Sequence, residues 1–306
     1  MPAHRNDRPP PPPATGTLTV VWQVDPASTG IWEGDWIRSL LAGLRYTEVV
    51  DTRHQVMAHQ ALVVDQRIKA GRLSYYGNYY RSGARFALLH LSDEGFADDC
   101  SVYGYCEQVF RNYWSPDLAH GDVGFLPLGY KSGFRIGAAR KSARERSYFW
   151  SFMGEQNRPT RPQMLDALEI LEPSYVHVSD AFGEGNYLPL EEYQAILEDS
   201  VFAACPSGFH SLDSFRIYEA LECGCIPVVE RRPGPDYFRE LFGGDHPLLE
   251  APDWTEARRR MQALLADPAA LEARRQACTA WWREYRTRLT GEVAEKLRAA
   301  LALAGG

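Results

Sequence analysis

The sequence predicts an α/β fold built from two domains, each a parallel β-sheet with helices on its faces. The chain has 306 residues, which is enough for two domains with cores of ordinary size. In both halves, alternating or β-branched segments are followed by amphipathic ones, so predicted strands and helices alternate. This order forms parallel sheets, leaves a cleft between two such domains, and places ligands at the carboxyl ends of the strands. The loops that follow strands are therefore the places to look for a site.

The predicted first domain spans residues 17–140 and begins with a β-branched strand at 17–25. A helix over 31–44 follows, and further strands are expected at 46–51, 85–94, 106–116 and from 123. The last of these runs into a loop punctuated by glycines. The aromatic run SYYGNYYRSG, residues 74–83, is expected to be a loop that is buried, faces another subunit, or stacks on a sugar acceptor.

The predicted second domain spans residues 141–275, and the basic stretch at 135–147 is the best candidate for the boundary. Strands are expected at 147–156, 174–182, 201–208 and 225–230. Helices are expected at 161–171, 190–200 and 213–224, with two or three more after residue 253. The alternation of the first domain therefore restarts in the second.

Composition restricts the partners and the compartment. A net charge of -7 argues against nucleic acid as a partner. Residues 1–16 contain five consecutive prolines, typical of a disordered tail, and lack the apolar core of a secretion signal. Apolar windows are too short for a transmembrane segment, and the six cysteines lack zinc-site spacing. We expect a cytoplasmic protein whose thiols are buried or free.

The stretch DSFRIYEALECGCIPVVE carries the clearest chemical pattern in the chain. Asp213 or Ser214 is a natural N-cap for a helix, Arg216 lies in its first turn, and Glu219 follows three residues later. The helix dipole disfavours a cation at this end, so a phosphate would supply the countercharge. A carboxylate one turn deeper accepts hydrogen bonds from a ribose diol. The pattern suits a nucleoside diphosphate; the alternative is an Arg216–Glu219 pair on a solvated helix.

The longer run SVFAACPSGFHSLDSFRIYEALECGCIPVVE, residues 200–230, resembles the signature of the exostosin-like glycosyltransferases. Upstream, SYFWSFMGEQNRPTRPQML, residues 147–165, resembles the same family's first strand of the second domain. In that element an arginine reaches toward the donor phosphates. Arg161 occupies the matching position and Arg158 is a neighbouring candidate, although Arg161 could also be a surface residue at the start of a helix.

The resemblance implies the GT-B architecture and a nucleotide-sugar donor, with UDP as the usual carrier, held by the second domain. It also implies that residues 276–306 form a helix that packs back on the first domain. The family usually inverts the anomeric carbon without an essential metal, and the chain has no Asp-x-Asp motif. Arginine, lysine and helix N–H groups would then stabilise the leaving diphosphate. The predicted donor-binding residues, besides Arg158, are Arg216, Glu219, Arg161, Lys131, Ser207, Gly208, Ser211 and Ser214.

Inverting transfer needs a general base for the acceptor hydroxyl, and this architecture takes it from the first domain. Asp93 ends a buried strand, whereas Glu33 and Asp35 open a helix, where acidic residues also serve as ordinary caps. His90, on the same strand as Asp93, is more typical of a core histidine. The islands HLSDE, FRNYW and PLGYKSGF resemble the ribitol xylosyltransferase branch of the family.

The sequence thus predicts an inverting, metal-independent glycosyltransferase that acts on a glycan or a polyol-phosphate acceptor. The alternative is a non-catalytic nucleotide-binding scaffold subunit of a polysaccharide assembly complex. An NAD(P)-dependent enzyme is disfavoured because the first strand of either half lacks a following Gly-x-Gly-x-x-Gly motif. Arg283, Arg286 and Arg288 would allow peripheral contact with a membrane, although plain solvation explains them better.

Overall fold

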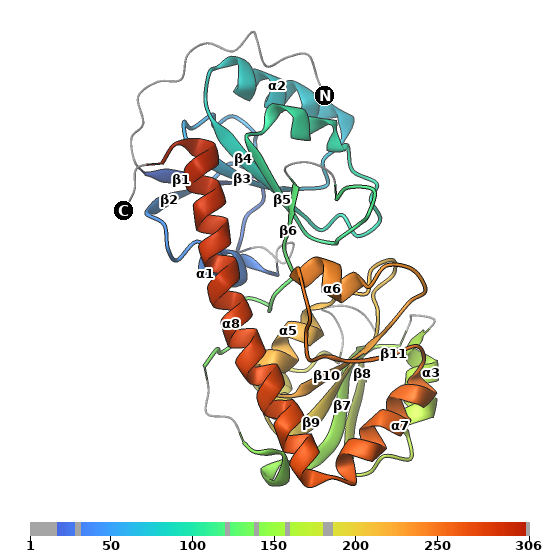
Figure 1. The fold of residues 1–306 in the computed structure, drawn as a ribbon. Helices are drawn as coiled ribbons and strands as arrows, with labels where there is room; N and C mark the ends of the chain where they lie inside the picture. Colours follow the sequence, from blue (N-terminus) through green and yellow to red (C-terminus); the bar gives the residue numbers. More distant parts are fainter. Residues whose placement is uncertain are drawn as a thin grey trace. The chain divides into compact units, whose positions relative to one another are not determined.

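The computed structural model describes residues 17–27, 32–119, 123–137, 141–156, 160–179 and 186–303. The predicted tail at residues 1–16 lies outside this part of the chain. Contacts divide the chain into two compact units: unit 1 runs to Pro127 and resumes at Thr287, and unit 2 is Leu128–Arg286. Each unit contains one sheet whose strands are all parallel, so the predicted α/β class with two parallel sheets is confirmed (Figure 1).

The sheet of unit 1 has six strands in the order β2-β1-β3-β4-β5-β6. Because β1 lies between β2 and β3, the chain leaves β1 in one direction and later returns to its other side. Such a switch point is where open α/β sheets bind ligands. The six strands are β1 (Leu18–Trp22), β2 (Tyr46–Val50), β3 (Ala61–Gln66), β4 (Phe86–Leu91), β5 (Gln108–Arg111) and β6 (Val123–Phe125).

The central strand β3 and the helix after it differ from the sequence prediction. No strand was expected at 61–66, because its apolar run is short and lacks alternation. The aromatic run expected as a loop is instead helix α2 (Leu73–Arg81), which follows the 3₁₀ turn η2 (Ala70–Arg72). Four tyrosines of α2 pack on one face of the sheet with the 3₁₀ segment η3 (Cys100–Tyr105) beside them. They form part of the core, which agrees with the expectation that this run is buried.

The other elements of unit 1 are α1 (Gly34–Leu40) and the last turns of the 34-residue helix α8 (Pro268–Leu301). Both contribute buried apolar side chains, among them Trp36 and Leu297. The side-chain amide of Gln60, just before β3, donates to the carbonyl oxygens of Leu301 and Ala302. The end of α8 is therefore an integral part of unit 1.

The sheet of unit 2 has five strands in the order β11-β10-β9-β7-β8. Its switch point lies between β7 and β9, because β8 follows β7 on one side and β9 pairs with β7 on the other. The strands are β7 (Tyr148–Glu155), β8 (Ser174–Ser179), β9 (Ser200–Cys205), β10 (Ile226–Glu230) and β11 (Leu249–Ala251).

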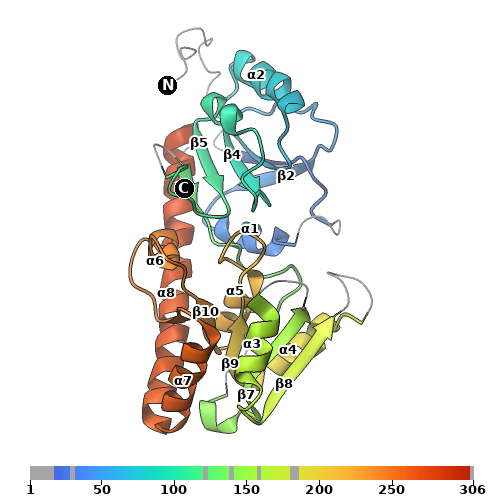
Figure 2. The same cartoon turned by 90° about the vertical axis from the view of Figure 1, so that its right-hand side faces the viewer.

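Helices cover both faces of this sheet, as Figures 1 and 2 show. Helices α4 and α5 contact each other and the strands β9, β7 and β10, whereas α3 contacts α7. The elements are α3 (Thr160–Leu168), α4 (Leu190–Glu198), α5 (Phe215–Glu222), α6 (Tyr237–Phe242), α7 (Trp254–Leu265) and the 3₁₀ turn η4 (Ala143–Glu145). Strands and helices of the second half therefore lie where the alternating pattern places them.

The division between the units falls at 127–128, not at the predicted 140–141, because residues after Pro127 bond to unit 2. The backbone N–H of Leu128 donates to Asp213, and that of Arg135 donates to the side chain of Gln194. Helix α8 changes unit at 286–287, not at residue 276, because Trp282 still donates to Glu222 of α5. Among the described helices, each is too short or too polar to cross a membrane.

Candidate functional site

Helix α5 begins at the carboxyl edge of the unit 2 sheet with an unusual N-cap. Ser214 has the extended backbone of an N-cap (φ −154°), but its side chain makes no capping hydrogen bond. Its hydroxyl is buried and has no hydrogen-bond partner among the described residues. Buried hydroxyl groups are normally paired, so this one is available to a ligand at the start of the helix.

Arg216 crosses from α5 to the end of β7, at the switch point of the sheet. Its Nε donates to the carbonyl oxygen of Met153 at 3.1 Å, and its guanidinium lies 5.4 Å from the ring centre of Phe152. A Cβ atom on Gly154 would lie 2.0 Å from Nη2 of Arg216, so only glycine leaves room for the guanidinium. The cation is thus held at the position where this fold binds ligands.

Gly154 is a site residue to which the sequence prediction gave no role. The signal was present, since a glycine interrupts the apolar strand SYFWSFMGE immediately before its end. Its φ of +151° is also a conformation that residues with side chains rarely adopt. The role became visible only when Arg216, which follows much later in the chain, was found against it.

The placement of Glu219 excludes one of its two sequence expectations. Its side chain is only 1% exposed, so it does not form a pair with Arg216 on a solvated helix face. It accepts a hydrogen bond from the hydroxyl of Tyr193 at 2.6 Å and one from the backbone N–H of Lys131 at 3.4 Å. Glu219 therefore joins α4, α5 and the Lys131 loop, and its contact with a ribose stays a prediction.

Lys131 lies in the same cluster of unit 2. Its ammonium group donates to the hydroxyl of Tyr187 and lies 5.1 Å from the centre of that ring. It is also 5.9 Å from the ring centre of Tyr193, the partner of Glu219. Two aromatic rings therefore hold a second cation near the helix that carries Arg216.

The remaining predicted donor-binding residues line the same edge of the sheet. Arg161 is buried at the start of α3, not on the surface, and donates to the carbonyl oxygen of Glu155 at 2.8 Å. Ser207 bonds Glu230 at the end of β10, and the Gly208 N–H donates to the carbonyl oxygen of Ser211. The Ser211 hydroxyl lies 2.9 Å from that of Tyr237. The loop after β9 is thus rigidly shaped. Arg158 lies outside the described residues.

In unit 1, Glu33 is a buried carboxylic acid with few hydrogen-bond partners among the described residues. It immediately precedes α1, and its side chain is buried. Its Oε2 accepts the backbone N–H of Trp32 at 3.0 Å, whereas its Oε1 has no hydrogen-bond partner among the described residues. Burial raises the pKa of the Glu33 carboxyl to about 7. A carboxyl group with this pKa and a free oxygen is suited to accept a proton near neutral pH.

Asp93 and Asp35 are in environments of a different kind. Asp93 accepts the backbone N–H of Ala97 at 2.8 Å through Oδ1, while Oδ2 lies 3.2 Å from Nη2 of Arg111. Both oxygens are therefore occupied, Oδ1 by a backbone N–H and Oδ2 by a buried ion pair. Asp35 is half exposed and pairs with Arg38 one turn later. Of the three carboxylates, Glu33 is the one with a buried oxygen that has no hydrogen-bond partner among the described residues.

Two groups of described residues have ligand atoms close enough to hold a metal ion: His90, Asp93 and Cys100, and Asp236, His246 and Glu250. In the first group, the guanidinium of Arg111 already lies against Asp93 and is 3.7 Å from the Cys100 sulfur. His90 there bonds Asp98 and Tyr103, and burial lowers its pKa. An arginine cation so close disfavours a metal ion at this place.

Comparison with known proteins supports the resemblance to glycosyltransferases that the sequence of the C-terminal half shows. Residues 134–238 match the family model "Exostosin GT47 domain". The chain is also 26% identical over 175 residues to ribitol-5-phosphate xylosyltransferase 1 of Danio rerio, and this match covers 50% of the chain. The match spans 39% of that relative, so the chain corresponds to about two-fifths of its length.

Solved structures share the whole fold at low sequence identity. An α1,3-fucosyltransferase superposes with a TM-score of 0.56 at 11% identity, over 99% of this chain and 92% of that one. HepE of Anabaena, solved with UDP-glucose, has a TM-score of 0.54 at 13% identity, over 92% and 99%. The T4 phage enzyme BGT with UDP-glucose has a TM-score of 0.52 at 10% identity, over 93% and 99%.

The family match spans β7, β9 and α5, and with them Arg161, Ser207–Ser214, Arg216 and Gly154. The predicted resemblance to the exostosin-like enzymes, and the more distant one to the ribitol xylosyltransferase branch, are both confirmed. Residues 134–238 therefore resemble the exostosin GT47 domain, and the chain shares its GT-B fold with the solved structures.

Proposed function

We propose that this protein is a glycosyltransferase that takes a sugar from a UDP-linked donor held by unit 2. The observation that carries the proposal is the placement of Arg216 against Gly154 at the switch point of a parallel sheet. Two of the structural neighbours were solved with UDP-glucose, and the relative from Danio rerio is a xylosyltransferase by name. These likenesses support a nucleotide-sugar donor.

The donor diphosphate would be bound by fixed cations and helix N–H groups. Arg216 and Arg161 both lie at the carboxyl edge of the sheet, and the Ser214 hydroxyl is available at the start of α5. When the bond between the sugar and the diphosphate breaks, negative charge develops on the leaving phosphate. Preorganised guanidinium groups stabilise that charge without reorganisation, which is what a metal-independent enzyme requires.

The transfer would proceed by single displacement with inversion, and Glu33 of unit 1 would be the general base. An acceptor hydroxyl gives its proton to Oε1 of Glu33 while its oxygen forms a bond to the anomeric carbon. The bond from that carbon to the diphosphate oxygen breaks at the same time, and UDP leaves. The free oxygen and the pKa of about 7 of Glu33 support this role. The acceptor would be a glycan or a polyol phosphate.

Calorimetric titration of the whole protein with UDP, GDP, CMP and ADP tests the donor assignment. We expect UDP to bind most tightly, with unchanged affinity in EDTA, and Arg216→Ala to weaken it at least tenfold. Arg259→Ala is the matched control, because Arg259 is an exposed arginine of the same unit whose ion pair with Glu256 lies within helix α7.

Each failure has a distinct meaning. If none of the four nucleotides binds, the donor assignment is wrong. If EDTA abolishes UDP binding, the enzyme depends on a metal. If UDP-sugars bind but UDP is never released with any acceptor, the chain is a nucleotide-binding scaffold and not an enzyme.

A further inference from the structure

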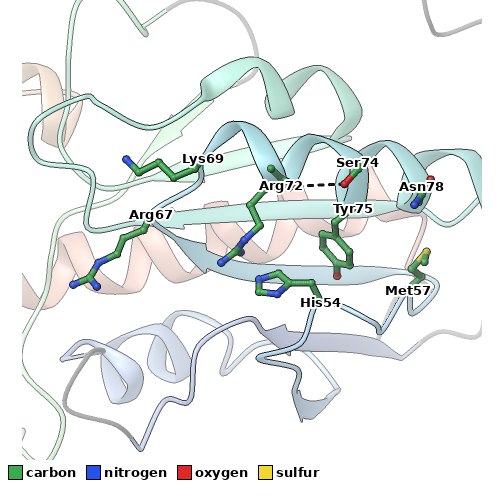
Figure 3. Close-up of a pocket in the computed structure, with 9 residues that line it drawn as sticks. His54, Met57, Arg67, Lys69, Arg72, Ser74, Tyr75 and Asn78 are labelled. Carbon is green, nitrogen blue, oxygen red and sulfur yellow. Dashed lines mark hydrogen bonds between the residues drawn. The ribbon is translucent and has the colours of Figure 1, made fainter.

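Unit 1 contains a cavity of about 580 Å³ that none of the site residues described above lines (Figure 3). Its wall includes His54, Arg67, Lys69 and Arg72, together with the less polar Met57 and Tyr75. The volume is in the range of small-molecule sites. Its lining residues among those described all belong to unit 1.

The cavity lies at the carboxyl edge of the unit 1 sheet. Arg67 directly follows β3, and His54 lies in the loop after β2. Trp22 of β1 is in register with Val50 and Val64, so the next residues of β1, β2 and β3 come together at this edge. Gln23, the residue after β1, donates to the Tyr75 hydroxyl at 2.8 Å. The cavity therefore lies beside the switch strand, where the fold binds ligands.

The lining carries three permanent cations and no carboxylate. Two of the cations are held by buried carboxylates: Arg72 donates to Asp65 at 2.7 Å, and Lys69 donates to Asp98 at 2.9 Å. The side chains of Asp65 and Asp98 are only 0% and 5% exposed, so they orient the cations without facing the cavity. Each cation keeps N–H donors beyond those that bind the acid.

A third carboxylate behind the cavity is also occupied. Asp51 is buried and accepts the backbone N–H groups of Gln55 and Val56, as well as the amide of Gln23. Its oxygens are directed to the loop and not to the lining. The donors that a ligand in the cavity would meet are therefore those of Arg67, Lys69 and Arg72.

Arg67 and His54 have backbone conformations that set them apart. Both lie in the left-handed region, with φ of 54° and 57°, which non-glycine residues adopt infrequently. Arg67 is exposed and forms no ion pair within the described residues, and the Nε2 atom of His54 is buried without a hydrogen-bond partner there. Backbone strain of this kind clusters at ligand sites, where the fold holds it in place.

These features identify the chemistry of the ligand. Guanidinium groups present a planar fork of donors that matches phosphate oxygens, and an ammonium group adds a point charge. The Tyr75 ring and Met57 offer apolar contact to a short carbon chain. We propose that this cavity binds the phosphate ester of a phosphorylated polyol or sugar acceptor. The proposal rests on the function proposed above, because it assigns the acceptor of that transfer.

Titration of the whole protein with ribitol 5-phosphate, ribitol and inorganic phosphate tests the cavity. We expect ribitol 5-phosphate to bind at least tenfold more tightly than either of the others, because only it fills both the charged and the apolar part. Arg67→Gln should weaken its binding about tenfold, and Arg67→Lys, which keeps the charge but not the planar fork, should recover part of the affinity. Arg45→Gln removes the same charge from the opposite, amino edge of the sheet and should leave binding unchanged.

Three results would overturn the proposal: equal binding of ribitol and ribitol 5-phosphate, equal binding of inorganic phosphate alone, or binding that Arg67→Gln does not affect. UDP affinity, measured on the same samples, separates this proposal from the function on which it rests. An intact UDP site with an insensitive Arg67 contradicts the cavity assignment only. Absence of UDP binding, with ribitol 5-phosphate still bound through Arg67, contradicts the donor assignment only.

Discussion

The two sheets have the same kind of switch point but differ in how their carboxyl edges satisfy polar groups. At the edge of unit 2, Glu219 bonds Tyr193 and Ser207 bonds Glu230, so the framework around Arg216 is largely fixed. At the edge of unit 1, Glu33 keeps an oxygen without a partner among the described residues, and its pKa is raised to about 7. One edge is built to hold a fixed charge, whereas the other holds a group that changes its charge.

A second contrast lies within unit 1, between two buried carboxylates. Asp93 and Glu33 are 7% and 2% exposed, so burial alone does not distinguish them. Asp93 forms an ion pair with Arg111 at 3.2 Å, whereas Glu33 accepts one backbone N–H, from Trp32, among the described residues. Partners, and not burial, therefore decide which of the two is structural. The predictions below test this comparison.

The largest effect is expected from Glu33→Gln, which removes the proposed base and keeps its shape. We expect kcat for sugar transfer to fall between about 10²-fold and 10⁴-fold, with UDP affinity unchanged. Steady-state kinetics and titration measure the two quantities. If transfer persists at the wild-type rate, Glu33 is not the base.

The pH dependence of kcat/KM and of stability in the wild-type protein tests the Glu33 carboxyl as well. A base with a pKa of about 7 must be ionised to act, so kcat/KM should fall about tenfold for each pH unit below 7. Stability should change in the opposite direction. Because the folded pKa is raised above 4.5, the folded state holds the proton more tightly, and stability is lost as pH rises from 4.5 through 7. Glu33→Gln should remove both dependences.

Asp93→Asn should act on stability and not on chemistry. It leaves the buried Arg111 cation without its charged partner, and breaking such pairs costs about 3 kcal/mol of unfolding free energy. Denaturant unfolding measures this loss, and kinetics below the unfolding range should show transfer largely retained. A stable variant without transfer would reverse the roles that the structure gives to Asp93 and Glu33.

Gly154→Ala tests whether Arg216 must lie against β7. The new Cβ would meet Nη2 at 2.0 Å, so the guanidinium has to move although its charge is kept. We expect UDP affinity to fall about tenfold. Gly234→Ala is the matched control, because it is also a positive-φ glycine of unit 2 but its Cβ would meet no atom within 4 Å. Equal affinities in both variants would mean that the position of Arg216 does not matter.

The smallest effect is expected from Gly291→Ala in α8. Gly291 lies in a helix, is exposed, and a Cβ there would meet no atom within 4 Å. Alanine should therefore stabilise the protein by about 0.5–1 kcal/mol without changing transfer. A thermal melt detects the gain. A loss of stability would show that the helix needs the conformational freedom of glycine at this position, although its surroundings leave room for a Cβ.

Most of the fold was readable in the sequence, because hydrophobic patterning reports local structure. Strands β7 and β10 and helices α4 and α5 lie within one or two residues of their predicted bounds. The misses have physical reasons. Strand β3 is central and too short to show an alternation of apolar and polar residues. In α2 the tyrosines form a core face, but the helix as a whole is too polar for this face to stand out in the sequence. The cavity residues Arg67 to Arg72 fall in this misread region.

The sequence by itself determined the alternation of strands and helices, the exostosin-like signature, and the place of Arg216 in the first turn of a helix. Those features depend on residues close together in the chain. Tertiary structure decided that Gly154 makes room for Arg216 and that Glu219 is buried against Tyr193. It also decided that, among the described residues, Glu33 and not Asp93 keeps a carboxylate oxygen without a hydrogen-bond partner. These outcomes depend on which distant groups meet and on what water can reach, and local patterning carries no information about either.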